Sequence, residues 1–264
     1  MHKDDSPFEI LKKCGARKQG HFILSSWRHS DEYIDKREVS VIPRYASMLC
    51  MQVADRFRGK KIAVVAGPAV GAIVPSWETA RLLTLYEDHD VKHVIPEKDE
   101  TRGSKKFKLS GTHARHVKGQ LVLVFEDIAT TGDSVAGAVE AILEAGGIVE
   151  DVVFIWNRGG VTAEKLGVNS VFSLINERLQ DWSEEEAPAS LLQIPVHPEL
   201  GRGAEYLRWT EAQSDVEMLL RSAAEKWPDP AIDRQVRDHL KLAREGKYYD
   251  HPTVQKLSSL CLAP

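Results

Sequence analysis

Four short runs of apolar residues constrain the fold of this chain more than any other feature. The runs IAVVA, VKHVI, LVLVF and VVFIW cover residues 62–66, 91–95, 121–125 and 152–156, and a weaker run, SVFSLI, covers residues 170–175. Strands that are apolar almost throughout are typical of parallel sheets whose two faces are both buried. The runs therefore predict the strands of one parallel sheet.

Helical periodicity occupies several of the intervals between these runs and also precedes the first. Apolar residues recur with helical spacing over residues 46–57, 70–80 and 135–142, and Gly146 and Gly147 end the last of these patterns. Strands that alternate with helices in this way indicate an α/β fold. We expect an open, doubly wound, mostly parallel sheet with helices on both faces.

Composition and charge exclude some classes of protein. The chain has 264 residues, of which 42% are hydrophobic and 28% are charged, and its formal net charge is −4. These values are ordinary for a soluble globular protein. A chain so close to neutral is not typical of a dedicated nucleic-acid binder.

The cysteines and the N-terminus indicate the compartment. Cys14, Cys50 and Cys261 follow no metal-binding or redox spacing, which favours free thiols in a reducing environment. The N-terminal residues MHKDDSPFEILKK contain no apolar core of a signal peptide, and no apolar run is long enough to cross a membrane. We expect a cytoplasmic protein that binds neither a membrane nor a nucleic acid.

The chain is at the upper end of the length that one α/β core usually holds. After Glu177 the sequence becomes acidic and turn-prone, and from Thr210 onward it has a helical pattern. We therefore expect an N-terminal segment of residues 1–40, a core of residues 41–180, and a linker with a C-terminal helical extension over residues 181–264.

The stretch from Glu97 to Lys118 separates two predicted strands without any steady period. It carries seven lysines and arginines against three acidic residues, although the whole chain is negative. Long aperiodic stretches are usually lids, binding loops or disordered segments. This one is either a solvated surface loop or a lid over an anionic ligand.

Two acidic residues, Glu126 and Asp127, follow the third predicted strand, which we expect to end at Phe125. Ligands of open α/β sheets bind beyond the carboxyl ends of the strands. Adjacent carboxylates at this edge can accept hydrogen bonds from a diol, such as two ribose hydroxyls. They can also hold a divalent cation, either directly or through water.

The next residues lead directly into a predicted helix. Thr130, Thr131 and Ser134 supply hydroxyl donors, and Gly132 allows the backbone to approach a ligand closely. The free amides and the dipole at a helix N-terminus favour an anion. The alternative is a polar turn in which Thr131 or Asp133 only caps the helix.

The segment from Glu126 to Ser134, preceded by four apolar residues, resembles the phosphoribosyl-pyrophosphate motif of type I phosphoribosyltransferases. That resemblance implies that Glu126 and Asp127 bind the ribose hydroxyls. It also implies that the segment from Thr130 through Asp133 to Ser134 binds the 5′-phosphate. Mg²⁺ is the implied cofactor, held by Glu126 and Asp127, directly or through water.

The segment of residues 21–35, HFILSSWRHSDEYID, resembles the N-terminal segment with which orotate phosphoribosyltransferases cover the pyrimidine. Ser26 belongs to the turn that would be Ser-Gly-Arg-like, and Trp27 stands where the family usually has glycine. Ser25 stands where many members have lysine, and Tyr33 lies near the aromatic positions. An ordinary β-hairpin is the alternative.

Two further segments resemble the same family. Gly67, Pro68, Ala69 and Gly71 match its second loop, which implies that backbone amides bind pyrophosphate there, although many strand-to-helix turns contain glycine. Arg158 matches an arginine that contacts orotate, and its planar guanidinium suits a carboxylate. A surface arginine is the alternative.

The resemblance also extends to the lid and to the reaction. Lys98 aligns with a lysine of the family's lid signature, and Arg102 is within reach of the same site. The implied reaction displaces pyrophosphate from C1 of the ribose with a ring nitrogen. Lys98 and Arg102, together with Asp127, are then the implied catalytic residues, because they stabilise charge as the bond to pyrophosphate breaks.

Three functions follow from these patterns. The first is transfer of phosphoribose to orotate, with phosphoribosyl pyrophosphate and a nucleobase as small-molecule partners and with the homodimer expected of the family. The second is transfer to another base, which Ser25, Trp27 and the altered lid favour. The third is a non-catalytic sensor of the sugar phosphate, with residues 210–264 as a partner-binding element.

Overall fold

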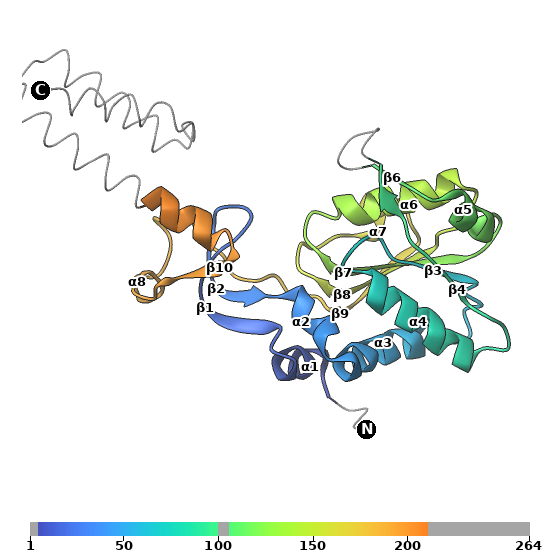
Figure 1. The fold of residues 1–264 in the computed structure, drawn as a ribbon, viewed down its shortest axis with the longest axis horizontal. Coiled ribbons are helices and arrows are strands. Elements are labelled where there is room, and N and C mark those ends of the chain that lie inside the picture. The colour runs from blue at the N-terminus through green and yellow to red at the C-terminus, as the bar shows by residue number, and fades with distance from the viewer. Residues whose placement is uncertain (1–4, 100–105, 211–264) are drawn as a thin grey trace, which may run out of the picture. The chain divides into compact units, whose positions relative to one another are not determined.

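The computed structural model describes residues 5–99 and 106–210. These residues form two compact units, which comprise residues 5–20 with 30–187 and residues 21–29 with 188–210 (Figure 1). The helical extension expected after Thr210 lies outside the described residues. No helix among those described is long and apolar enough to span a membrane.

A five-stranded parallel sheet forms the centre of the larger unit. Its strands are, in spatial order, β4 (Lys92–Val94), β3 (Val64–Ala66), β7 (Val122–Ala129), β8 (Asp151–Asn157) and β9 (Ser170–Ile175). The chain winds outward from β3 to β4 on one side and from β7 through β8 to β9 on the other. The order therefore reverses between β3 and β7, which is where open sheets of this kind bind ligands. The predicted doubly wound parallel sheet is confirmed.

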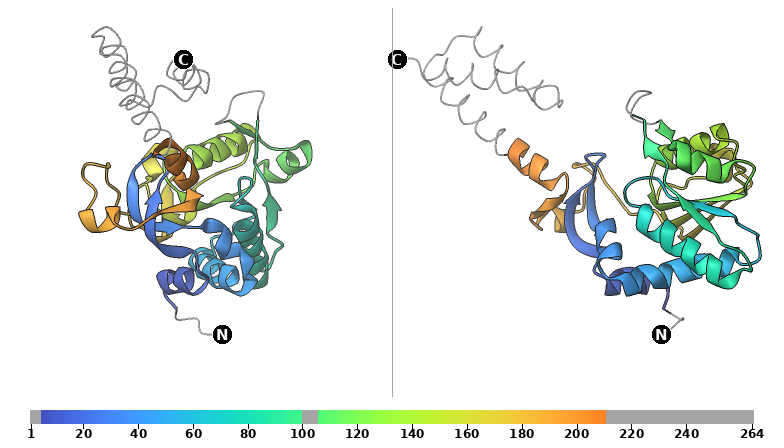
Figure 2. Two further views of the ribbon diagram at one scale, coloured as in Figure 1. Left: turned by 60° about the vertical axis from the view of Figure 1, so that its left-hand side comes forward. Right: turned by 45° about the vertical axis from the view of Figure 1, so that its right-hand side comes forward.

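Helices cover both faces of this sheet (Figure 2). One face carries α1 (Pro7–Lys13), α3 (Pro43–Phe57) and α4 (Ile73–Tyr86), and the other carries α5 (Gly111–Val117) and α6 (Asp133–Glu144). The strand residues alternate between the two cores: Leu123 and Phe125 join the first, whereas Val122 and Val124 join the second. Burial on both faces explains why the strands are apolar without interruption.

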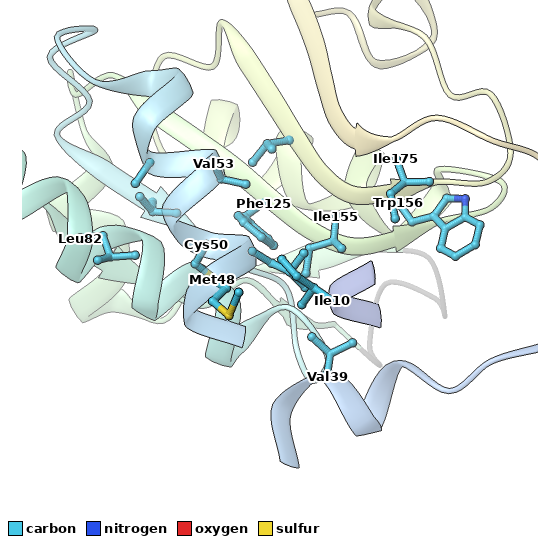
Figure 3. Packing of buried hydrophobic residues seen from close by; sticks show 14 of the residues in the cluster. Ile10, Val39, Met48, Cys50, Val53, Leu82, Phe125, Ile155, Trp156 and Ile175 are labelled. Carbon is cyan, nitrogen blue, oxygen red and sulfur yellow. The ribbon is translucent and has the colours of Figure 1, made fainter. Parts of the chain in front are cut away.

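Figure 3 shows the first of these cores from close by. Ile10 of α1, Met48 and Cys50 of α3, and Phe125 of β7 lie in this cluster. Each fully buried large apolar side chain contributes about 1.5–3 kcal/mol relative to an exposed one. This core also includes Val39, from the short helix α2 (Lys36–Val41), and thereby fixes α2 on the larger unit.

The stretch expected to be one long aperiodic loop contains regular structure. Strands β5 (Glu97–Lys98) and β6 (Phe107–Lys108) pair antiparallel, and α5 follows them. Phe107 is buried, and Ser110 caps α5 by accepting a hydrogen bond from the His113 amide. The expectation failed because two-residue strands and a seven-residue helix are too short to produce a period.

A second sheet has three strands. Its spatial order is β10 (Val196–Gly201), β1 (Arg17–Ile23) and β2 (His29–Ile34), and β10 pairs parallel with β1. The smaller unit also contains α8 (Ala189–Leu192) and a helical stretch over residues 203–210. The sequence did not predict β10, because its residues VHPELG neither alternate nor form an apolar run.

Candidate active site

Strand β7 extends further than expected and carries both acids within it. It ends at Ala129 rather than Phe125, because Ile128 and Ala129 still pair with Trp156 and Asn157 of β8. Glu126 and Asp127 are therefore buried, with exposed fractions of 9% and 5%. Two adjacent buried carboxylates are costly unless a ligand or a cation compensates them.

The two carboxylates are electrostatically unequal. Burial and the neighbouring charge of Asp127 raise the pKa of Glu126 to about 8. Oδ1 of Asp127 accepts a hydrogen bond of 2.7 Å from the Ile128 amide, and Nζ of Lys36 lies 3.2 Å from Oδ2. The approach of Lys36 gives an ion pair but no hydrogen bond to Oδ2, which is buried and accepts none. This oxygen is suited to accept a hydrogen bond from a ligand hydroxyl or from a metal-bound water.

The raised pKa of Glu126 predicts how the stability of the ligand-free protein depends on pH. The folded protein binds this proton more tightly than the unfolded chain, so stability should fall as the pH rises from about 4.5 to 8. Glu126→Gln should reduce that fall, because an amide does not ionise. Thermal unfolding of both proteins across this range tests the prediction, and identical pH profiles would contradict it.

The predicted anion site follows β7 directly. Helix α6 begins at Asp133. Its N-cap is Gly132, which has a φ of +77° and, as a glycine, has no side chain to cap the helix. The Asp133 amide is 3.5 Å from Oγ1 of Thr131, at the limit of a hydrogen bond. The cap therefore leaves the helix N-terminus open to an anion, beside the exposed Thr130, Thr131 and Ser134.

The end of β8 supports the turn between β7 and α6. The amides of Arg158 and Gly159 both donate to the Ala129 carbonyl, at 2.9 and 3.0 Å. A Cβ at Gly159 would lie 1.5 Å from the Thr130 carbonyl oxygen. Nζ of Lys165, from α7 (Ala163–Leu166), donates to the Thr131 carbonyl at 2.6 Å. Sequence reasoning missed both Gly159 and Lys165, although the glycine pair after a strand was a usable signal.

The turn between β3 and α4 reaches the same acids but offers fewer amides than expected. The amides of Gly67 and Ala69 donate to the carbonyls of Val94 and Pro96, at 3.2 and 3.1 Å, and Pro68 has no N–H. These amides are therefore not available to pyrophosphate, which corrects the expectation. Gly71 lies against the acid of β7, since a Cβ there would be 2.1 Å from Oδ2 of Asp127.

Arg158 and Tyr33 occupy the larger unit near one another. Arg158 is half-buried, and this burial lowers the pKa of its guanidinium, whereas the charge of Asp181 opposes the shift. A partly desolvated guanidinium favours an anionic ligand. Arg158 is therefore not the freely solvated surface arginine of the alternative interpretation.

The remaining predicted residues belong to the turn between β1 and β2 and to the predicted lid. Ser26 is exposed in the turn between β1 and β2, within the smaller unit. The neighbouring Trp27 has a φ of +61°, a conformation that suits the glycine usual at this position, and the Arg202 guanidinium lies 5.1 Å from its ring centre. Lys98 is exposed on β5. Arg102 lies outside the described residues.

Glu126 and Asp127 are suited to hold Mg²⁺ in the way that proteins usually hold Mg²⁺ that is bound to a substrate. The part of the chain that the structure describes contains no cluster of three or more metal-ligating side chains. Mg²⁺ often takes only one or two carboxylates, retains several waters, and obtains its other ligands from substrate phosphates. The buried Oδ2 of Asp127, which accepts no hydrogen bond, is consistent with such a site.

Comparison with known proteins gives relatives of this chain. No family model matches the chain. The orotate phosphoribosyltransferase of Pelotomaculum thermopropionicum is 34% identical over 192 residues, which cover 73% of this chain and 94% of the relative. That of Caldicellulosiruptor bescii is 32% identical over 198 residues, which cover 74% and 96%.

A solved structure shows the same fold. The orotate phosphoribosyltransferase of Mycobacterium tuberculosis H37Rv superposes with a TM-score of 0.52 at 23% identity, covering 65% of this chain and 97% of that one. The two curated relatives exceed 30% identity over nearly their whole lengths. The chain therefore belongs to the orotate phosphoribosyltransferase family.

Proposed function

We propose that this protein transfers the phosphoribosyl group of phosphoribosyl pyrophosphate to orotate and releases pyrophosphate. The observation that carries the proposal is the pair of buried carboxylates at the end of β7, directly before the open N-terminus of α6. The first feature suits a sugar diol and the second suits a phosphate. The product would be orotidine 5′-monophosphate, an intermediate of pyrimidine biosynthesis.

Each part of the site has a distinct role in this reaction. Glu126 and Asp127 hold the two ribose hydroxyls, and the turn from Thr130 to Ser134 holds the 5′-phosphate. Gly71 and its neighbour Val70 direct backbone amides to pyrophosphate. Mg²⁺, when bound, supplies positive charge to the pyrophosphate oxygens. The protein contributes position and charge rather than a covalent nucleophile.

The base and the lid complete the proposed site. Arg158 binds the orotate carboxylate with its planar guanidinium, and Ser26 and Tyr33 belong to the segment that covers the ring. Lys98 and Arg102 approach the leaving pyrophosphate and exclude water when the lid closes. In functional terms, residues 1–40 cover the base, residues 41–180 form the catalytic core, and residues 181–264 form the linker and extension.

We also propose that the protein is a homodimer and that α4 lies at the interface. Exposed apolar side chains follow one face of α4, at Val74, Trp77 and Leu85, with exposed fractions of 50%, 54% and 67%. Val70, 81% exposed, continues this face into the turn beside Asp127. Trp77→Glu should therefore give a monomer in sedimentation experiments. A dimer that persists in this variant would exclude α4 as the interface.

The cytoplasmic location and the lack of a nucleic-acid partner stay predictions of the sequence.

Pyrophosphate release with a panel of bases tests the proposed function. Purified protein, Mg²⁺ and phosphoribosyl pyrophosphate should release pyrophosphate with orotate and form orotidine 5′-monophosphate. Release with another base and not with orotate would favour the second function, which Trp27 at a position suited to glycine supports. Binding of phosphoribosyl pyrophosphate without turnover of any base would favour a non-catalytic sensor.

A further inference from the structure

Lys36, in the larger unit, lies between the acids of β7 and the turn that follows β3. Lys36 is the first residue of α2, and its Nζ lies 3.2 Å from Oδ2 and 3.5 Å from Oδ1 of Asp127. The same atom lies 3.2 Å from the point that a Cβ on Gly71 would occupy. The ammonium is thus adjacent both to the ribose-binding acids and to the turn that faces pyrophosphate.

That turn has little positive character of its own. Residues 67–71, Gly-Pro-Ala-Val-Gly, contain no basic side chain. Pro68 has no N–H, and the amides of Gly67 and Ala69 donate to backbone carbonyls of the β4 end. In this turn, that leaves the amides of Val70 and Gly71 as the ones to contact pyrophosphate. Pyrophosphate gains charge as it leaves, so a cation at this point would stabilise it in addition to Mg²⁺ and the lid residues.

The environment of Lys36 leaves it able to bind a second anion. Its side chain is 52% exposed, whereas that of Asp127 is 7% exposed, so the ion pair covers one side of the ammonium only. A lysine has three N–H donors and can contact two anions at once. Its backbone is fixed, because Asp35 caps α2 and Val39 is buried in the core. Its neighbour Arg37 is 76% exposed and pairs with Asp35.

We propose that Lys36 is a catalytic residue that contacts the pyrophosphate group while it remains paired with Asp127. As the C1–O bond breaks, both its electrons pass to the pyrophosphate oxygen. The ring nitrogen of the base bonds to C1 and loses its proton to water. Lys36 keeps its own proton and donates a hydrogen bond to pyrophosphate throughout. This role rests on the proposed phosphoribosyl transfer and adds a residue from α2 to it.

Binding of inorganic pyrophosphate and of ribose 5-phosphate tests this role separately from turnover. Lys36→Met should weaken pyrophosphate binding, measured by calorimetry with Mg²⁺, by about 10- to 100-fold, the loss typical of a hydrogen bond to a charged group. Affinity for ribose 5-phosphate, which lacks the pyrophosphate, should change by less than about threefold, and kcat should fall by about 10²-fold. Lys36→Arg should recover most of the pyrophosphate affinity.

Arg37→Met is the matched control, because it removes a cation from the next position of the same helix. Its affinities and kcat should stay at wild-type values. The proposal is overturned if Lys36→Met weakens the binding of ribose 5-phosphate as much as that of pyrophosphate. It is also overturned if the variant lowers the melting temperature and changes neither affinity. In both cases the role of Lys36 is limited to its ion pair with Asp127. If wild-type protein forms no nucleotide with any base, phosphoribosyl transfer fails, yet the two binding measurements still decide the role of Lys36.

Discussion

Asp127→Asn should lower kcat by about 10²–10³-fold, the range seen when one preorganised electrostatic contact to a transition state is removed. Asparagine matches the size of the side chain but removes the charge that pairs with Lys36. In the proposed reaction the same charge polarises the ribose hydroxyls. The folded protein should not lose stability, because the variant removes the neighbouring charge that, together with burial, raises the pKa of Glu126. Steady-state kinetics and thermal unfolding of the same preparation measure both effects.

Asp88→Asn is the control for this variant. Asp88 is a fully exposed carboxylate far along the chain from the site, and its side chain has only a 3.4 Å contact with His89. The kcat of Asp88→Asn should stay within about twofold of the wild-type value, since exposed ion pairs of this kind contribute little to the stability of a protein. A kcat within threefold of the wild type in Asp127→Asn would show that the acid of β7 does not act in the reaction.

Gly159→Ala should disrupt the proposed phosphate-binding turn. The new Cβ would lie 1.5 Å from the carbonyl oxygen of Thr130, and backbone atoms cannot rotate away as a flexible side chain can. Overpacking of a tight site typically costs about 1–3 kcal/mol. The turn proposed to bind the 5′-phosphate must shift as well, so affinity for ribose 5-phosphate should fall by at least about tenfold. Calorimetry and thermal unfolding measure these two losses.

Gly111→Ala provides the comparison for this substitution. A Cβ at Gly111 meets no atom within 4 Å, and the residue begins α5 on the face opposite α3. The Gly111→Ala variant should bind ribose 5-phosphate with wild-type affinity. Its melting temperature should equal that of the wild type or lie slightly above it, because alanine favours helices. Wild-type affinity in Gly159→Ala would mean that the end of β8 does not set the position of Thr130.

The sheet could be predicted from the sequence because burial on both faces makes its strands continuously apolar. The end of β7 could not, because Glu126 and Asp127 resemble the polar end of a strand. Pairing with β8, through contacts such as Ala129 with Asn157, extends the strand past them. Tertiary pairing thus overrides local composition at the residues that matter most for function. The same holds for β10, whose sequence has no strand pattern of its own.

The candidate phosphate-binding segment could be proposed from the sequence because its acids, hydroxyls and helix start are contiguous in the chain. Lys36 could not, because it is separated from Asp127 by 91 residues and reaches it only when α2 packs on the core. Gly159 and Lys165 contact the turn in the same indirect way, from the end of β8 and from α7. Contacts between distant segments leave no local spacing in a single sequence.

The position of the bound activated sugar tests the central claim most directly. A crystal structure with Mg²⁺ and phosphoribosyl pyrophosphate should show the ribose hydroxyls at Glu126 and Asp127. The 5′-phosphate should lie between Thr130 and Ser134, at the N-terminus of α6. Density for the sugar at any other part of the molecule, with these two acids unoccupied, would contradict the account.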